Sequence, residues 1–144
     1  HEALAEVRRS VGVLQADRAP APLATRLRDL ASATDGWGAA VSLEIPGPAR
    51  ALAPEVEHAL FRVAQEGLTN VRKHAQARSA LVLLDYRDPG RVGLRVTDDG
   101  RGAAPGSDGC GLAGLRERIT ALGGRVVTEH PAGGGFRLQV EIPA

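Results

Sequence analysis

Between residues 54 and 96 the sequence changes from a helical to an alternating hydrophobic pattern, and this change limits the possible folds most strongly. After Pro54, apolar residues recur three or four positions apart, as on one face of a helix: Val56, Leu60, Val63, Ala64, Leu68 and Val71. The apolar run 80–86 and the alternating run 91–97 are typical of strands. An Asp-Pro-Gly turn at 88–90 joins them as a hairpin. A helix that buries one face beside a hairpin predicts layered α and β structure.

Weaker patterns on both sides of this region extend the predicted domain. Residues 23–30 and 112–122 repeat leucine or isoleucine at helical spacing, and residues 41–45 alternate as a strand. A final hairpin is expected from 125–130 and 136–142 around the turn PAGGG. We therefore expect an α+β fold, a two-layer α/β sandwich with a mixed sheet of about five strands covered on one face by about three helices.

The first residues predict a separate helical segment. Residues 1–15 carry apolar side chains at alternating spacings of three and four, the pattern of a coiled coil or bundle: Leu4, Val7, Val11 and Leu14. A stretch rich in proline and alanine at 16–22 is typical of a stiff linker. We expect 1–15 to be the C-terminal end of an upstream helical dimerisation domain, and 23–144 to be one catalytic domain.

Composition excludes several classes of function. The 144 residues carry a formal net charge of +1 and only 3% aromatic residues, which disfavours a nucleic-acid-binding surface. No apolar run is long enough to span a bilayer, and the single cysteine suits a reducing compartment. We expect a cytoplasmic fragment without direct membrane contact, which leaves open that the full-length protein is membrane-anchored.

A polar stripe on the predicted core helix is the first candidate site. Glu66, Asn70 and Lys73 lie at i, i+4 and i+7, so they share one face. An amide oxygen is a neutral, hard ligand for a Mg²⁺ ion that already carries phosphate oxygens. A lysine supplies positive charge to phosphates, and Glu66 could orient a nucleophile or water. The alternative is a solvated helix face with i, i+4 pairs.

The segment TDDGRG at 97–102 is the second candidate. Asp98 follows a strand that ends near Val96, and the glycines after it let the backbone pass close to a ligand. An ionised carboxylate only accepts hydrogen bonds, so it can accept one from the adenine amino group but not from the carbonyl of guanine. The alternative is an Asp-Asp-Gly turn on a surface hairpin.

The third candidate is the glycine-rich stretch before the helix at 112–122. Gly109 and Gly111 are expected immediately before that helix, whose free N–H groups and dipole favour phosphate. Residues 99–110 would then form a lid that closes on a triphosphate. The alternative is a flexible connection with glycine at a helix start.

Taken in order, EGLTNVRKHA, TDDGRG and GCGLAGLRERI resemble the N, G1 and G2 boxes of the GHKL (HATPase) ATP-binding fold. The resemblance covers about residues 22–144, is closest to the catalytic domain of sensor histidine kinases of the nitrate-sensor-type subgroup, and implies a Bergerat fold that binds ATP and Mg²⁺. By this resemblance Asn70 would hold Mg²⁺, Lys73 and His74 would approach the phosphates, and Asp98 would read adenine. The residues that would shape the lid and its helix are Gly100, Gly102, Gly109, Gly111 and Leu112. Glu66 stands where related ATPases keep an activating carboxylate.

The resemblance also implies partners. The γ-phosphoryl group of ATP would pass to a histidine on a separate dimeric helical domain, and then to a response regulator with a helix-turn-helix output domain. The sequence departs from the family at Phe136, where a threonine is common, and His1 is interpreted as a fragment boundary and not as the acceptor. Two other functions stay open: a serine kinase of the anti-sigma type, and a non-catalytic nucleotide-sensing interaction module.

Overall fold

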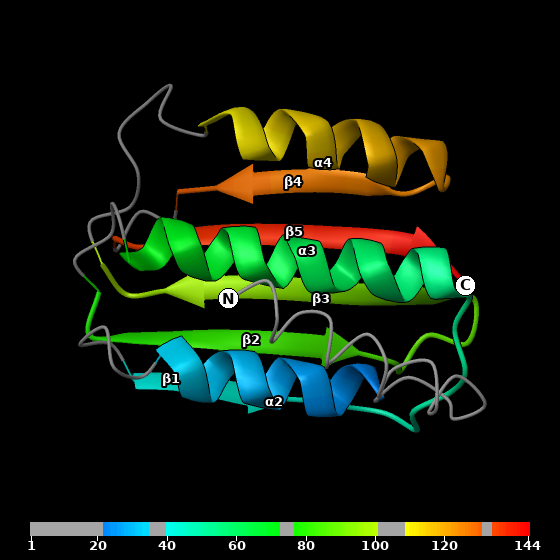
Figure 1. Ribbon diagram of the computed structural model, residues 1–144, viewed down its shortest axis with the longest axis horizontal. Helices are drawn as coiled ribbons and strands as arrows, with labels where there is room; N and C mark the ends of the chain where they lie inside the picture. Colours follow the sequence, from blue (N-terminus) through cyan, green and yellow to red (C-terminus); the bar gives the residue numbers. More distant parts are fainter. Residues whose placement is uncertain (1–21, 35–39, 73–76, 101–108, 131–133) are drawn as a thin grey trace, which may run out of the picture.

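The structure is a computed structural model that describes residues 22–34, 40–72, 77–100, 109–130 and 134–144, with side chains from residue 113 onward in the last helix. The predicted segments 1–15 and 16–21 lie outside the described residues. The elements, in chain order, are α2 (Leu23–Thr34), β1 (Ala40–Glu44), α3 (Pro54–Asn70), β2 (Ser79–Asp85), β3 (Arg91–Asp98), α4 (Gly109–Ala121), β4 (Arg125–Glu129) and β5 (Phe136–Pro143) (Figure 1).

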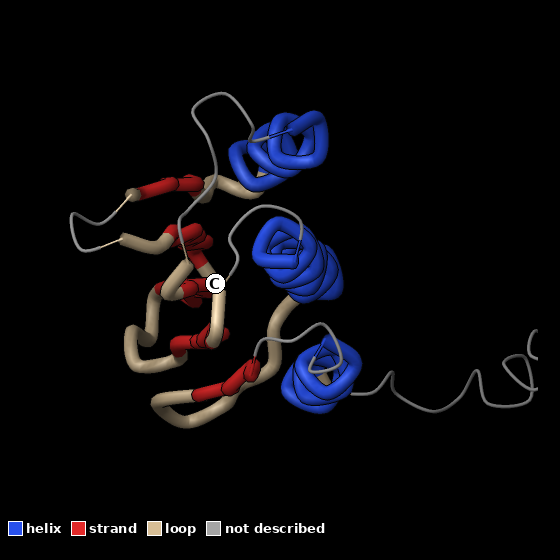
Figure 2. The backbone as a smooth tube through the Cα atoms, turned by 90° about the vertical axis from the view of Figure 1, so that its left-hand side faces the viewer, coloured by secondary structure: helices blue, strands red, loops and turns tan. Residues whose placement is uncertain are grey.

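The elements form two layers. The five-stranded sheet has the order β1-β2-β3-β5-β4, with β1 parallel to β2 and every other neighbouring pair antiparallel. The helices α2, α3 and α4 lie side by side on one face of the sheet, and the other face carries no helix of the described chain (Figure 2). The predicted α+β sandwich is therefore confirmed. No helix in the described part of the chain combines the length and the hydropathy needed to cross a bilayer.

The hydrophobic period explains the layers. Along β3 every second residue is buried, so one face of the strand meets the helices and the other faces outward. Helix α3 begins with Pro54 at its first turn, followed by Glu55 and Glu57, which suit the positive end of the helix dipole. Its apolar stripe lies over the middle of the sheet and joins the helix-facing residues of β2, β3 and β5 in one core.

Helix α3 approaches β3 closely at Gly67. A Cβ atom at this position would lie 2.9 Å from Cγ2 of Val96, closer than real side chains approach one another. Because Gly67 lacks that atom, α3 can rest directly on β3 three residues before the helix ends. This contact sets the spacing between the C-terminal end of α3 and the C-terminal end of β3.

The opposite end of the sheet is held by Arg50, from the loop between β1 and α3. Its guanidinium group donates to the carbonyl oxygens of Tyr86 at 3.1 Å, Arg91 at 2.7 Å and Ala144 at 3.0 Å. It also lies over the Tyr86 ring, 5.7 Å from the centroid. One side chain thus joins the end of β2, the start of β3 and the end of the described chain.

Two glycines on helices allow a matched test of this packing. Gly67→Ala should lower the free energy of unfolding by about 1–2 kcal/mol, because overpacking against Val96 outweighs the gain in helix propensity. The new methyl group of Gly114→Ala, in α4, meets no atom of the described residues within 4 Å, so this change should raise the free energy of unfolding by up to about 1 kcal/mol. Urea denaturation of both variants measures the difference, and equal shifts would contradict the close approach.

Candidate functional site

Three polar or glycine-rich segments that are far apart in the sequence reach the same end of the molecule. Helix α3 ends at Asn70, strand β3 ends at Asp98, and helix α4 begins at Gly109 (Figure 1, left). Strand β5 also starts there, with Phe136 paired to Asp98 in register. The edge of the sheet where these ends meet is the candidate site.

Asp98 is the most unusual residue of this edge. It continues the buried alternation of β3, so its carboxyl group points to the helix side, and the residue is only 6% exposed. The backbone N–H of Gly100 donates to its Oδ1 at 2.8 Å, and the backbone of Phe136 also donates to the carboxyl group. Burial nevertheless raises the pKa of Asp98, and the neighbouring charge of Asp99 raises it further. This carboxylate is desolvated and oriented, and two donors leave it able to accept a further hydrogen bond from a ligand.

Asp99 has a different role from its neighbour. Its carboxylate accepts hydrogen bonds from the backbone N–H groups of Arg78 at 2.8 Å and Ser79 at 3.0 Å, and from the Ser79 hydroxyl at 2.8 Å. These bonds hold the pKa of Asp99 below its usual value and tie the end of β3 to the start of β2. The first aspartate therefore faces the site, and the second fixes the strand that carries it.

Asn70 and Glu66 lie on α3, one turn apart. Asn70 is 9% exposed, so the predicted polar stripe is not a solvated face at this position. Glu66 is half-buried and lines a shallow hollow between α2 and α3, beside Thr34 and Leu30. The structure thus brings Asn70 to the edge that carries Asp98, while Glu66 lies one turn back, toward α2.

A divalent cation would have few protein ligands here. The described residues contain no group of three His, Cys, Asp or Glu side chains that could hold a metal ion. The neutral amide oxygen of Asn70 suits Mg²⁺ as one ligand of several, with the others supplied by phosphate oxygens and water. The donor set therefore fits a metal that arrives with a nucleotide.

Several predicted site residues have no described side chain. Lys73, His74 and Gly102 lie outside the described residues. Gly109 and Gly111 were expected immediately before the helix, but α4 already begins at Gly109, so both belong to its first turn. Only the backbone assignment is described for Leu112.

Comparisons with known proteins agree with this geometry. The family model described as "Histidine kinase-, DNA gyrase B-, and HSP90-like ATPase" matches residues 55–144. The chain belongs to this family. Its match begins at the start of α3 and includes every element that reaches the candidate site.

Within the family, the similar proteins are histidine kinases. UhpB of Salmonella typhimurium strain LT2, a signal transduction histidine-protein kinase/phosphatase, is 46% identical over 86 residues, which are 58% of this chain and 17% of UhpB. The ShkA structure, a full-length protein in complex with AMPPNP, has a TM-score of 0.69 and 26% identity, covering 87% of this chain and 30% of that one.

The histidine kinase domain of a blue-light activated kinase from Erythrobacter litoralis has a TM-score of 0.66 and 25% identity, covering 85% of this chain and 61% of that one. The chain spans only about a sixth of UhpB and under a third of ShkA. The chain is an ATP-binding catalytic domain of the sensor histidine kinase type.

Sequence reasoning missed two glycines and one carboxylate that shape the candidate site. Gly67 sets the approach of α3 to β3, Gly135 lies against the backbone of Asp98, and Asp99 anchors β3. The glycine-only run at 133–135 was a signal for a strained turn, since only glycine adopts positive φ without cost. Both Asp98 and Asp99 stand at the end of a predicted strand, and no other sequence signal distinguished their roles.

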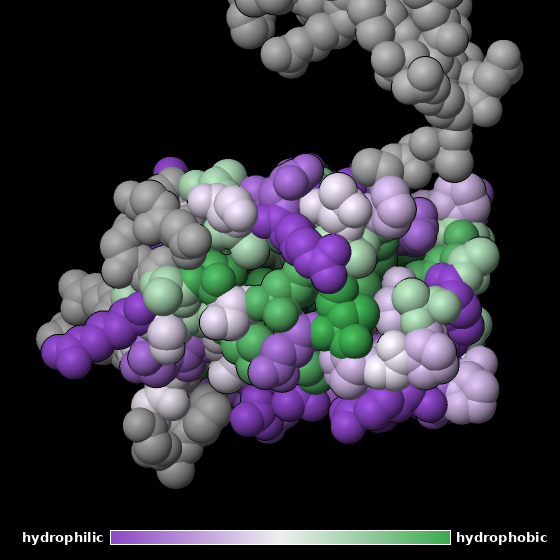
Figure 3. Space-filling model, turned by 90° about the horizontal axis from the view of Figure 1, so that it is seen from below, coloured by the Kyte–Doolittle hydropathy of each residue, from purple (hydrophilic) through white to green (hydrophobic). Residues whose placement is uncertain are grey.

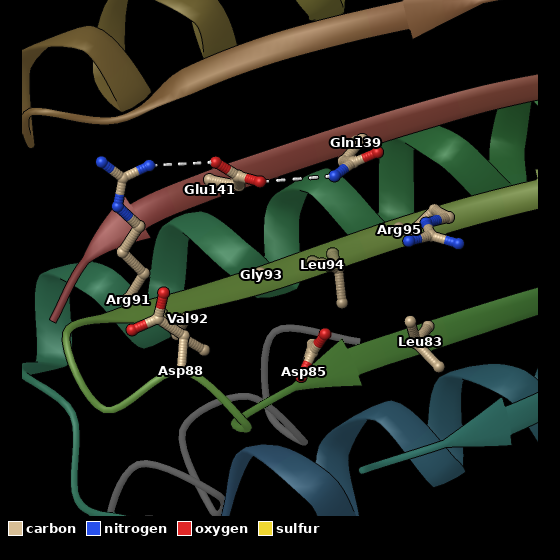
Figure 4. A pocket seen from close by; sticks show the side chains of 10 residues that line it. All are labelled: Leu83, Asp85, Asp88, Arg91, Val92, Gly93, Leu94, Arg95, Gln139 and Glu141. Carbon is tan, nitrogen blue, oxygen red and sulfur yellow. Dashed lines mark hydrogen bonds and ion pairs between the residues drawn. The ribbon is translucent and has the colours of Figure 1, made fainter. Parts of the chain in front are cut away.

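A second hollow lies on the open face of the sheet and does not belong to the site. It is lined by side chains near the opposite strand ends, including Asp85, Arg91, Gln139 and Glu141 (Figure 4). Seen from the α2 and β1 edge, hydrophilic residues line the border of this open face, and apolar ones gather between the sheet and α2 (Figure 3). Glu141 pairs with Arg91 at 3.3 Å, and Arg87 pairs with Asp85 at 2.8 Å, so these charges neutralise one another.

Replacing Asp98 or Asp85 by the neutral asparagine should change the free energy of unfolding in opposite directions. The pKa of Asp98 is raised, so its ionisation lowers stability as pH rises from about 3.9 through the folded value. Asp98→Asn should therefore gain stability over the wild type across that window and keep the gain at neutral pH.

Asp85 supplies the control. Hydrogen bonds from Arg87 lower the pKa of Asp85, so its contribution is present above the unfolded pKa and lost as pH falls through the folded one. Asp85→Asn should be less stable than the wild type at pH 7, with a smaller deficit in acid. Urea unfolding from about pH 2 to 8 checks both signs, because the Asp85 contribution is lost only below about pH 3.9. An Asp98→Asn curve parallel to the wild type would contradict the burial argument.

Proposed function

We propose that this domain binds Mg-ATP at the edge where α3 and β3 end, and supplies the γ-phosphoryl group to a histidine on a separate helical domain. The observation that carries the proposal is the Asp98 carboxylate, buried at the end of β3 and held by two backbone donors. A buried ionisable group with a shifted pKa is typical of a functional site.

Asp98 would select adenine. Its free acceptor can take a hydrogen bond from the exocyclic amino group, whereas a purine with an oxygen at that position would present a second acceptor. A hydrogen bond to a charged group contributes about 1.5–3 kcal/mol, and an unpaired buried partner costs at least as much. One carboxylate is therefore enough for a strong preference between the two bases.

The phosphates would lie between α3 and the start of α4. Asn70 would contribute one oxygen to Mg²⁺, and Lys73 with His74 would approach the phosphate oxygens. The first turn of α4, with Gly109 and Gly111, offers free backbone N–H groups and the positive end of a helix dipole. Gly100, Gly102 and Leu112 would complete the lid, and Glu66 would orient the attacking group.

The acceptor would come from another domain. Residues 1–15 would be the end of the dimerisation domain that bears the phosphorylated histidine, which the relatives' greater length supports. The phosphoryl group would then pass to a response regulator with a helix-turn-helix output domain, and the full-length protein would be membrane-anchored. Membership of the nitrate-sensor-type subgroup stays a prediction.

The kinase interpretation is favoured over the two alternatives by the similar proteins, which are named as histidine kinases. A serine kinase of the anti-sigma type and a nucleotide-sensing module without catalysis could use the same edge. A serine kinase would differ from a histidine kinase in the residue that it phosphorylates. A sensing module would differ in transferring no phosphoryl group at all.

Asp98 and Asn70 should contribute to different parts of nucleotide binding, the choice of base and the effect of Mg²⁺. Asp98→Ala should abolish the preference for ATP over inosine triphosphate, which has an oxygen in place of the adenine amino group, a loss of about 10- to 100-fold. Asn70→Ala should keep that preference and lose the gain in affinity that Mg²⁺ provides. Calorimetric titrations with and without Mg²⁺ measure both, and Asp29→Ala, at an exposed position of α2, is the control. Equal losses of affinity for ATP and inosine triphosphate, with and without Mg²⁺, would contradict these separate roles of Asp98 and Asn70.

Phosphoryl transfer is tested in trans. The domain, mixed with a separate helical domain that bears the acceptor histidine and with ATP labelled at the γ-phosphate, should label that histidine in an Asn70-dependent way. An acceptor domain with histidine replaced by glutamine is the control. Tight ATP binding without label on any supplied acceptor would support the nucleotide-sensing alternative instead.

A further inference from the structure

Strand β5 begins unusually close to the end of β3. Gly135, the residue before β5, has φ of +92°, and a Cβ atom on it would collide with the carbonyl oxygen of Asp98. That Cβ would also lie 3.6 Å from Cα of Asp99. Only glycine allows this approach, because it combines a positive φ with the absence of a side chain.

The approach has a direct consequence for the Asp98 carboxyl group. Phe136 follows Gly135, is 4% exposed, and pairs with Asp98 in the β3–β5 register. Its backbone donates a hydrogen bond to the Asp98 carboxyl group, while Gly100 donates from the other side at 2.8 Å. The carboxylate is thus held between one donor that follows it in sequence and one donor from another strand.

We propose that Gly135 is a positioning residue for base recognition: its missing side chain brings the Phe136 N–H onto the Asp98 carboxylate and sets the direction of its remaining acceptor. The inference rests on the proposed function, because it assigns that acceptor to the adenine amino group. It also explains how a site with phenylalanine at position 136 can work, since the backbone of this residue, and not its side chain, makes the contact.

Gly134 provides a matched control. Its φ of +99° is as unfavourable for an L side chain as that of Gly135. Among the described residues, however, a Cβ there would meet only the carbonyl oxygen of Gly100, at 3.6 Å. Alanine at either position therefore strains the same turn. Only alanine at position 135 also pushes the start of β5 away from Asp98.

The experiment compares the wild type, Gly134→Ala and Gly135→Ala in titrations with ATP and inosine triphosphate. Gly134→Ala should keep the wild-type ratio of the two affinities even where its melting temperature falls. Gly135→Ala should reduce the ratio by about tenfold, as expected from losing the orientation of one charged hydrogen bond. A folded Gly135→Ala with the wild-type ratio, or an equal reduction in both variants, would overturn the inference.

If Gly135→Ala does not fold, a measurement on the wild type tests the hydrogen bond between the Phe136 amide and the Asp98 carboxyl group. The amide proton of Phe136 should shift with pH as Asp98 ionises, because the two groups share a hydrogen bond. The Asp99 charge also acts on the Asp98 carboxyl group, and the His130 ring lies 5.3 Å from the Phe136 ring. The shift should therefore persist in His130→Gln and disappear in Asp98→Asn.

A Phe136 amide that does not titrate with Asp98 would overturn the inference. Failure of the proposed function gives a different result, because a wild-type domain without preference for ATP over inosine triphosphate contradicts adenine reading itself. A clear wild-type preference together with an unchanged Gly135→Ala ratio contradicts the role of Gly135 alone.

Discussion

A carboxylate buried where β3 leaves the core is the feature on which the rest of this structure depends. Removing Asp98 from water is costly, and the raised pKa records that cost. Two backbone N–H groups offset part of it, and both belong to segments that must approach the strand end closely. The turn after β3 and the start of β5 are therefore shaped around one side chain, the one that we propose to recognise the base.

The close approaches around this site need glycine. Gly67 lets α3 rest on β3 beside Val96, and Gly135 lets β5 begin against the backbone of Asp98. In both places a side chain would push apart elements that carry the proposed site residues. At the far end of the sheet, by contrast, Arg50 joins three carbonyl groups and closes the structure. The sheet is thus fixed at one end, and the other end is where the polar residues meet.

Much of the fold follows from the periodicity of single elements. The stripe on α3 and the alternation of β3 depend on neighbours three, four or two positions away, so they are visible in the sequence. Asp98 could be proposed as a site residue for the same reason, because it lies at the end of an alternating run. The boundary of α4 was less accessible, since Gly109 and Gly111 favour a loop by propensity, whereas the helix already includes them. The burial of Asn70 was also missed, because helical spacing alone cannot show what packs against a face.

The sequence by itself determined which elements form, the order of the three motifs and the family to which they point, because these depend on local spacing and residue chemistry. Tertiary structure alone decided that Asp98 faces the site while Asp99 anchors β2, and that Phe136 contributes its backbone to the same carboxylate. The physical reason is that β3 and β5 pair across a long stretch of chain, since even Asp98 and Phe136 are almost forty positions apart. The close contacts of Gly67 and Gly135 exist only after that pairing and the packing of α3 have formed.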